Sequence, residues 1–475
     1  MDWLSERAAQ TPNAPALEFM GQKWDYETLN HWVESLAVQL ESRGIERRAR
    51  VAIHLANQPV YVALIHVLAR IGAVAVPLNI RLTEAEIELQ IEQSQCSCLI
   101  CDSELTVPVK RILVSELSST PPQLPPQERP LLEPHAVQGI FFTSGTSGFP
   151  KGAQLTFDNH HASALASAQR LGVNSRDRWL LNMPLYHIGG MSIVFRAALH
   201  GFAIVLHPNF DVEAAHRALT NENITIVSLV PTMLHRLLEK DPAFKPSSSL
   251  RVILLGGAGA PVDLLEKALT LNLPLALTYG LTEAASQVAT STPAETRAKA
   301  GSVGKPLPGT TVDIVDESGK SLPRGEIGEI VISGRTVMHG YLDSKEPPKR
   351  FHTGDIGYLD SDGDLWVLTR RTDLIVSGGE NVYPEEVERA LLKHPSVSEA
   401  CVVGIPDAEW GQSVAAAVVL REPCSQETLI QFLREQVAGY KVPRRITFVE
   451  VLPRTASGKL KRAEIAGLLN LNTTP

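Results

Sequence analysis

Residues 142–152 read Phe-Thr-Ser-Gly-Thr-Ser-Gly-Phe-Pro-Lys-Gly and directly follow the apolar pair Ile140-Phe141. Glycines in such a loop let backbone N–H groups approach anionic oxygens closely, hydroxyls donate hydrogen bonds, and Lys151 adds a mobile positive charge. A Walker loop is excluded, because the G-x-x-x-x-G-K-[ST] spacing is absent. The stretch predicts a phosphate-binding loop, and a glycine-rich surface turn is the alternative.

Outside this loop, the first 300 residues alternate between strand and helix patterns. Apolar residues at helical spacing are followed by short apolar runs, and this order recurs along the chain. It predicts an α/β fold with layered, largely parallel sheets that carry helices on both faces. The predicted elements are a helix that ends at Gly44, a helix at about 60–71, and strands at 51–55, 73–77, 204–206, 224–227 and 252–255.

The pattern changes after about residue 310. Turn residues at 316–319 and 360–364 indicate hairpins, and therefore a β-rich antiparallel subdomain. Past Asp373 about a hundred residues carry their own strands and helices, which predicts a small α+β domain. Because 475 residues exceed a single core, we expect an N-terminal domain at 1–369, a junction at 370–373 and a C-terminal domain at 374–475.

Composition excludes several classes of protein. The net charge of −8 gives no general attraction to nucleic acid phosphates. No apolar run reaches the roughly 18 residues of a membrane helix, and the N-terminal residues lack the basic-then-apolar order of a signal peptide. We therefore expect a cytoplasmic protein without a membrane span and without a nucleic acid partner. The sequence leaves a homo-oligomer possible.

Two clusters suggest metal sites, and in both cases another interpretation is favoured. Cys96, Cys98 and Cys101 lie in a segment that is typical of a short buried strand, and no fourth soft ligand is close in sequence. The segment Asp360-Ser-Asp-Gly-Asp364 superficially resembles a calcium loop. Its glycine, Gly363, comes at position four, whereas an EF-hand needs glycine at position six. We predict a hairpin turn there.

The loop at 142–152 resembles the phosphate loop of the superfamily of AMP-forming acyl-CoA synthetases, luciferases and peptide-synthetase adenylation domains. Ser147 stands where that family usually has threonine, which preserves the hydroxyl. Further matches follow in the family's order over nearly the whole chain. They are Pro184-Leu185-Tyr186-His187, Gly256-Gly257-Ala258, Tyr279-Gly280-Leu281-Thr282-Glu283, Thr353-Gly354-Asp355, Arg370 with Asp373, Gly378-Gly379-Glu380-Asn381, and Lys459.

The resemblance implies an enzyme that uses ATP and Mg²⁺ to convert a carboxylic acid into an acyl-adenylate and then passes the acyl group to coenzyme A. Glu283 resembles the metal ligand, since a carboxylate is a hard ligand suited to Mg²⁺, and Lys459, Thr282 and His187 complete the implied catalytic set. Tyr279 offers a flat face on which adenine can stack, and a core aromatic is the alternative. The implied ATP-binding residues are Thr143, Ser144, Gly145, Thr146, Ser147, Gly148, Lys151, Gly257, Ala258, Tyr279, Gly280, Asp355 and Arg370.

The resemblance also implies a moving C-terminal domain. Thr372 corresponds to the hinge about which that domain turns between the two half-reactions, because one site cannot present Lys459 and a thiol tunnel at the same time. Gly378, Gly379 and Glu380 correspond to the path of coenzyme A.

The implied acid pocket comprises His187, Gly189, Arg196, Gly256 and Ser286. The segments 177–192 and 282–287 resemble the o-succinylbenzoate–CoA ligases of menaquinone biosynthesis, whose substrate has two carboxylates. Arg196 is a candidate anchor for the second carboxylate, and a surface arginine or one that satisfies a helix dipole is the alternative. His187 either orients the substrate at the pocket or is a satisfied core histidine.

Other functions are compatible with the same motifs. They include another aryl- or fatty-acid–CoA ligase, a stand-alone adenylation enzyme that loads a carrier protein, and a luciferase-like oxygenase. A non-catalytic ATP-binding regulator is disfavoured by the presence of both Glu283 and Lys459.

Overall fold

The alternation of strands and helices builds two large sheets that share one apolar core. The computed structural model describes residues 2–117, 133–144, 150–344, 346–369, 374–453 and 460–471. The chain divides into two compact units. Unit 1 comprises Met1–Ile80, Ile91–Phe141 and Gly152–Thr369; unit 2 comprises Arg81–Gln90, Phe142–Lys151 and Arg370–Pro475.

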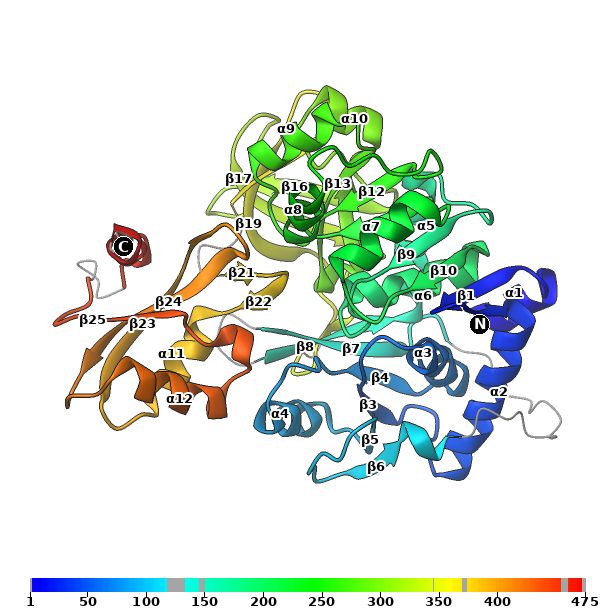
Figure 1. Cartoon of the computed structure of the whole chain (residues 1–475), viewed down its shortest axis with the longest axis horizontal. Helices are drawn as coiled ribbons and strands as arrows, with labels where there is room; N and C mark the ends of the chain where they lie inside the picture. Colours follow the sequence, from blue (N-terminus) through cyan, green and yellow to red (C-terminus); the bar gives the residue numbers. More distant parts are fainter. Residues whose placement is uncertain are drawn as a thin grey trace. The chain divides into compact units, whose positions relative to one another are not determined.

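The first sheet has nine strands within the described residues, and those at its centre are parallel (Figure 1). Its order is β15 (Lys305–Pro306), β14 (Ser286–Thr290), β13 (Leu275–Leu281), β12 (Val252–Leu255), β11 (Ile226–Leu229), β9 (Arg178–Leu181), β10 (Ala203–Leu206), β1 (Pro15–Phe19) and β2 (Gln22–Asp25). β11 begins two residues later than the sequence predicts, since its pairing with β9 and β12 starts at Ile226.

The second sheet is also parallel at its centre, where β3 lies between β4 and β5. Within the described residues its order is β18 (Gly340–Tyr341), β8 (Pro150–Thr156), β7 (Val137–Ser144), β4 (Val74–Pro77), β3 (Arg50–His54), β5 (Cys98–Cys101) and β6 (Lys110–Leu113). Cys98 and Cys101 are buried on β5, and burial raises the pKa of both thiols, as expected of structural cysteines.

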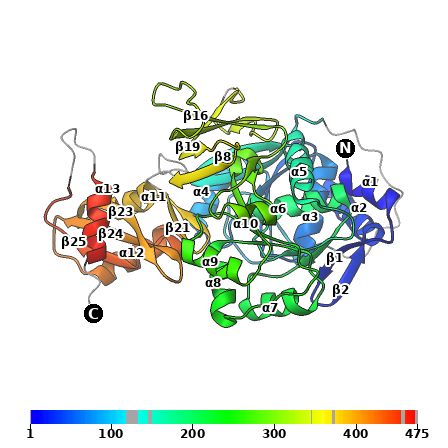
Figure 2. The same ribbon diagram turned by 90° about the horizontal axis from the view of Figure 1, so that it is seen from above.

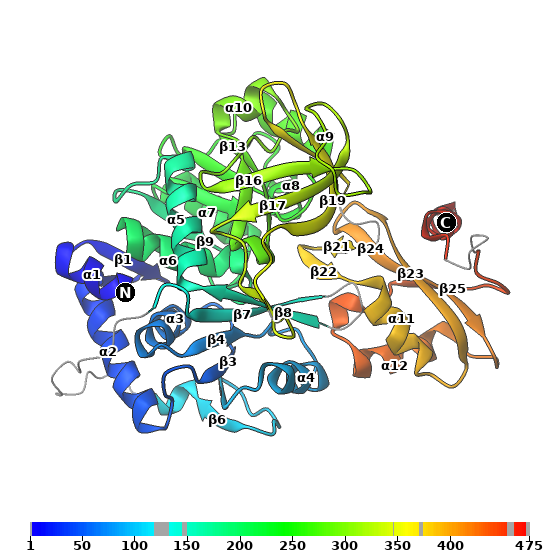
Figure 3. The ribbon, with the colours of Figure 1, turned by 180° about the vertical axis from the view of Figure 1, so that it is seen from behind.

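Helices lie on these sheets at positions set by their caps. α5 (Phe157–Leu171) starts with a capping box between Thr156 and Asn159 and ends at Gly172, whose φ of +63° is left-handed. In Figures 1 and 3, α6 (Ile188–His200) lies between β9 and β10 of one sheet and β7 of the other. The remaining helices of this part of the chain are α1 (Trp3–Gln10), α2 (Tyr26–Ser42), α3 (Pro59–Ile71), α4 (Glu84–Ser94), α7 (Val212–Asn221), α8 (Pro231–Lys240), α9 (Val262–Thr270) and α10 (Pro293–Ala298).

Two smaller sheets complete the chain. The antiparallel sheet of β16 (Thr310–Val315), β17 (Gly328–Gly334), β19 (Phe351–Leu359) and β20 (Leu365–Thr369) belongs to unit 1 and is visible in Figure 2. Unit 2 contains β21 (Ile375–Ser377), β22 (Glu380–Val382), β23 (Val397–Asp407), β24 (Gly411–Leu420) and β25 (Arg445–Phe448), with α11 (Pro384–Leu392), α12 (Gln426–Gln436) and α13 (Arg462–Leu471). The predicted α/β fold class, with its β-rich and α+β parts, is confirmed.

No helix among the described residues is long and apolar enough to cross a membrane.

The core of unit 1 contains side chains from both large sheets and from α2, α3, α5 and α6. It also encloses histidines. His160 of α5 is 2% exposed, its ring lies 4.7 Å from that of Phe195, and neither ring nitrogen has a hydrogen-bond partner among the described residues.

His160 is expected to make the protein acid-sensitive. Burial, together with the nearby charge of Arg196, lowers the pKa of His160 to about 3. The unfolded chain binds a proton below about pH 6.5 and the folded chain does not, so stability falls as the pH drops. At pH 5 this linkage removes about 2 kcal/mol relative to pH 8. Urea unfolding of His160→Gln should show a correspondingly smaller loss between pH 8 and pH 5 than the wild type.

The matched control for this experiment is His31→Gln, which removes an exposed imidazole on α2. If the wild type and His160→Gln lose the same free energy of unfolding on acidification, His160 is not the group responsible.

Candidate active site

The turn between β13 and β14 is shaped by a glycine and by unusual backbone angles. A Cβ at Gly280 would lie 1.8 Å from the carbonyl oxygen of Ser286, so no other residue fits there. Ala285 and Ser286 both have positive φ, at 51° and 104°. Between them and Gly280, residues Thr282–Ala284 form a single 3₁₀ turn that presents Thr282 and Glu283, both partly exposed.

Glu283 is held from two directions by the segment around β18. The Tyr341 hydroxyl donates to the Glu283 carboxylate at 2.7 Å, and the Met338 N–H donates to its backbone carbonyl at 2.8 Å. These two hydrogen bonds fix the orientation of this partly exposed residue, which suits a ligand for Mg²⁺ that keeps several waters. Sequence reasoning missed Tyr341, because it lies 58 residues from its partner.

Tyr279 and Asp355, from two separate motifs, meet in the same region of unit 1. The Tyr279 hydroxyl donates to Asp355 Oδ2 at 2.6 Å, and the Asp355 N–H donates to Thr353 Oγ1 at 3.0 Å. The Tyr279 ring is 4% exposed and packs in an apolar cluster with strands of the antiparallel sheet. The structure thus buries Tyr279 and joins it directly to Asp355, another of the predicted ATP-binding residues.

Glycines also open the carboxyl end of β12. A Cβ at Gly256 would lie 2.5 Å from Thr278 Cγ2, and Gly257 is exposed with φ of +82°. Ala258 follows and is partly exposed. Carboxyl ends of parallel strands are the usual ligand-binding edge of an open α/β sheet, so Gly256, Gly257 and Ala258 lie where a nucleotide is expected.

The segment from β9 to α6 is fastened by an asparagine that sequence reasoning missed. Asn57 accepts from Leu185 N at 2.9 Å and donates to the carbonyls of Met183 (2.9 Å) and His207 (3.2 Å). It therefore holds the end of β10 and the residues before α6 together. A polar side chain between the end of strand β3 and Pro59 was the available sequence signal.

His187 occupies the N-cap position of α6 without a side-chain capping hydrogen bond, and it is half-buried, with its ring 4.7 Å from that of Tyr186. It is therefore not a fully buried core histidine. Gly189 and Gly190 follow it, and a Cβ at Gly190 would lie 2.2 Å from the Pro184 carbonyl. This close approach brings the start of α6 against the Pro184–His187 segment.

Arg196, two turns further along α6, is 2% exposed, which excludes the alternative of a surface arginine. Its guanidinium lies 5.7 Å from the centre of the Trp179 ring. Within the described residues Nε and Nη2 have no hydrogen-bond partner, and burial lowers the pKa of Arg196 to about 10. A buried cation with unsatisfied donors is energetically unfavourable unless an anion completes it.

The predicted phosphate loop is described at its two ends. Thr143 Oγ1 donates to the Lys151 carbonyl at 3.4 Å, and Ser144 is the last residue of β7. The other predicted site residues in this loop, at the junction 370–373 and near the C-terminus lie outside the described residues: Gly145, Thr146, Ser147, Gly148, Arg370, Thr372 and Lys459.

In unit 2 the predicted coenzyme A path forms a tight turn between β21 and β22. Gly378 and Gly379 have φ of +59° and +86°, and a Cβ at Gly378 would lie 2.5 Å from the Trp410 ring. The Arg444 guanidinium also contacts this tryptophan, 4.4 Å from the centre of the Trp410 ring. Glu380, which follows the glycines, is 5% exposed.

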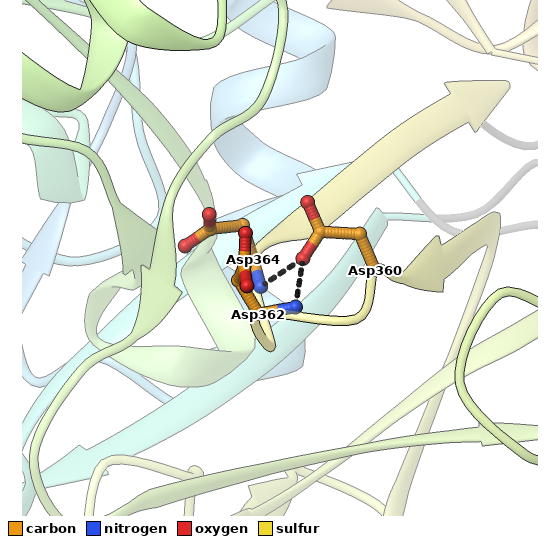
Figure 4. A group of neighbouring side chains, drawn as sticks. All are labelled: Asp360, Asp362 and Asp364. Atoms are coloured by element: carbon orange, nitrogen blue, oxygen red, sulfur yellow. Dashed lines mark hydrogen bonds between the residues drawn. The ribbon is translucent and has the colours of Figure 1, made fainter.

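Asp360, Asp362 and Asp364 form the acidic cluster that the sequence suggested (Figure 4). The backbone N–H groups of Asp362 and Asp364 both donate to Asp360 Oδ1 at 3.0 Å, which closes the predicted hairpin turn between β19 and β20. Lys299 Nζ lies 2.6–2.8 Å from all three carboxylates, and these hydrogen bonds raise the pKa of Lys299. An ammonium group therefore occupies the centre of the cluster and offsets part of its negative charge.

Comparisons with known proteins agree with the motifs. The family model described as AMP-binding enzyme matches residues 4–342, and that described as AMP-binding enzyme C-terminal domain matches residues 386–459. The chain is 40% identical to a 2-succinylbenzoate–CoA ligase of Bacillus cereus, with 98% of each chain covered.

Two solved structures of o-succinylbenzoate CoA synthetase from Bacillus subtilis are also similar, each at 37% identity. A double mutant bound with the product analogue OSB-NCoA has a TM-score of 0.92 and covers 98% of this chain and 97% of that chain. The complex with ATP and a magnesium ion has a TM-score of 0.74 and covers 98% of both.

Proposed function

This chain belongs to the AMP-binding enzyme family, and from that premise we propose that it is an ATP-dependent o-succinylbenzoate–CoA ligase of menaquinone biosynthesis. The observation that carries the proposal is 40% identity to a 2-succinylbenzoate–CoA ligase over 98% of both chains. The described geometry supports it: Glu283 is oriented by Tyr341, and Asp355 is joined to Tyr279.

In the first half-reaction the succinyl carboxylate attacks the α-phosphorus of ATP, an acyl–phosphate bond forms, and pyrophosphate leaves. We assign Asp355 and Arg370 to the ribose hydroxyls, and Gly257, Ala258, Gly280 and the backbone beside Tyr279 to the adenine. The loop from Thr143 to Lys151 and Thr282 receive the phosphates, while Glu283 holds Mg²⁺. When bound, Mg²⁺ neutralises charge on the phosphates.

In the second half-reaction the thiolate of coenzyme A attacks the acyl carbonyl, the thioester bond forms, and AMP leaves. We assign Gly378, Gly379 and Glu380 to the thiol path. The C-terminal part at 374–475 turns relative to 1–369 about residues 370–373, with Thr372 as the hinge. One boundary between the two compact units, at Thr369 and Arg370, supports this division, although Arg81–Gln90 and Phe142–Lys151 group with the C-terminal unit.

The acid pocket is assigned to the start of α6 and the strand ends that it faces. His187 and Gly189 lie at that helix end, Gly256 directly follows β12, and Ser286 begins β14. Arg196 supplies the positive charge. Because two of its guanidinium nitrogens lack partners among the described residues, we assign it to the benzoate carboxylate, which would complete this buried cation.

We further propose a cytoplasmic location, where ATP and coenzyme A are both present. The acids, ATP and coenzyme A are the assigned partners, and assembly into a homo-oligomer is compatible with the function.

The function is tested by measuring AMP and acyl-CoA formation with a panel of acids. The wild type is expected to turn over o-succinylbenzoate best. In Arg196→Met, kcat/KM for this dianion should fall. The corresponding loss of transition-state stabilisation should be about 2–4 kcal/mol, the range for breaking a buried charge pair. Monoacids of similar shape, such as 4-phenylbutyrate, should change little, because they have no second carboxylate.

The two parts of the proposal fail separately in this assay. Equal losses for monoacids and the dianion would reject Arg196 as the anchor. If the wild type does not turn over o-succinylbenzoate but does turn over another acid, the assignment of the substrate is rejected and the assignment as an acid–CoA ligase is retained.

A further inference from the structure

Ala285 and Ser286 form the most unusual backbone next to the candidate active site. Both carry a Cβ, yet their φ values are +51° and +104°, in the region that favours glycine. Their neighbour across the turn is Gly280, whose missing side chain leaves just enough room for the Ser286 carbonyl. Strained backbone of this kind persists where surrounding structure holds it in place, and it concentrates at functional sites.

The peptide that links these two residues is held by a side chain from α5. Ser163 Oγ donates to the Ala285 carbonyl oxygen at 2.7 Å, and Ser163 is 2% exposed. That oxygen belongs to the peptide plane between Ala285 and Ser286. A hydrogen bond to it therefore restrains ψ of Ala285 and φ of Ser286, and the latter is the larger of the two positive φ values.

The same helix also restrains the other side of the turn. Asn159 Nδ2, in the first turn of α5, donates to the carbonyls of Arg335 and Val337 at 2.8 and 2.9 Å. The next residue, Met338, donates its N–H to the Glu283 carbonyl at 2.8 Å. α5 thus fixes Glu283 through residues 335–338 and fixes Ala285 directly through Ser163.

We propose that Ser163 is a positioning residue, which holds the strained 285–286 peptide so that Thr282 and Glu283 keep the orientation needed for transfer to the α-phosphate. The inference rests on the proposed function of the turn. Ser163 acts through the backbone of Ala285 and does not itself touch substrate. Without its hydroxyl the peptide can rotate toward ordinary torsions, and the two functional side chains move with it.

Pyrophosphate exchange tests this role. In Ser163→Ala, kcat of exchange should fall about 5- to 50-fold, the range for a lost buried hydrogen bond, while KM for the acid stays within about twofold. The matched control is Ser167→Ala, one turn further along α5. Ser167 is 0% exposed and its hydroxyl has no partner among the described residues, so this variant should keep wild-type kcat.

Rescue separates positioning from a general loss of packing. Glycine accepts a left-handed φ without strain, so Ala285→Gly should restore most of the activity that Ser163→Ala loses. Unchanged kcat in Ser163→Ala, an equal loss in Ser167→Ala, or no rescue by Ala285→Gly would each overturn the proposal. If Ser163→Ala does not fold, Ser163→Cys, with a weaker donor of similar size, takes its place with the same expectation.

A second readout is independent of the acid. In a calorimetric titration with Mg²⁺ and ATP alone, the affinity of Ser163→Ala should be at least about 5-fold lower than that of the wild type. The affinity of Ser167→Ala should be unchanged. If the wild type supports pyrophosphate exchange with none of the acids tested, the proposed function is rejected. The titration would still decide on Ser163, because equal affinities of Ser163→Ala and the wild type for Mg²⁺ and ATP overturn its positioning role.

Discussion

Replacement of Lys459 by alanine should lower the rate of acyl-adenylate formation on the order of 10³-fold, while thioester formation from supplied acyl-adenylate stays largely intact. Negative charge develops on the α-phosphate and on the leaving pyrophosphate in the transition state. An ammonium group placed there stabilises that charge more than the ground state. Because the resemblance assigns Lys459 to the first half-reaction, the second should not depend on it.

The chain offers a matched control for this variant in Lys461, two residues further on. Its Nζ lies 3.2 Å from Glu464 and its side chain is about half exposed, so it forms a surface ion pair. Lys461→Ala should change both half-reactions less than about twofold. Pyrophosphate exchange at the wild-type rate in Lys459→Ala would remove this lysine from the adenylation step.

The second large effect is expected for Glu283→Gln. The substitution keeps the size of the side chain and an oxygen that can accept from Tyr341, but it removes the negative charge assigned to Mg²⁺. Adenylation should slow on the order of 10²- to 10³-fold, and the Mg²⁺ concentration for half-maximal rate should rise at least about tenfold. Rates measured over a Mg²⁺ titration separate the loss of metal affinity from the loss of maximal rate.

Tyr341→Phe is the control for orientation as opposed to charge. It removes the 2.7 Å hydrogen bond and leaves the carboxylate, so its effect on adenylation should be about 5- to 10-fold. If Glu283→Gln has the same Mg²⁺ dependence as the wild type, Glu283 is not the metal ligand.

Much of the fold could be predicted because the relevant signals are local. The strand around Val51 and the helix that ends at Gly44 follow from apolar spacing and a glycine cap within a dozen residues. The turn at 360–364 follows from its own aspartates and glycine. The predicted start of β11 is two residues too early, because the strand begins where it pairs with β9 and β12, which lie far from it along the chain.

The residues of the candidate site also fall into two groups: those that local motifs predict and those that depend on distant partners. Family motifs predict Tyr279, Glu283 and Asp355 as site residues, because reactive side chains occupy fixed positions in short segments. Those segments say nothing about Asn57 or Tyr341, which act on residues 58 to 150 positions away.

The sequence by itself determined the α/β class, the β-rich and α+β regions, and the chemistry of the motifs, since periodicity, turns and reactive groups are properties of neighbouring residues. Tertiary structure alone decided that Arg196 is buried against Trp179 and that Ser163 reaches the Ala285 carbonyl across 122 residues. The physical reason is packing: whether a side chain is buried, and which partner it has, depends on elements that come together only when the chain folds.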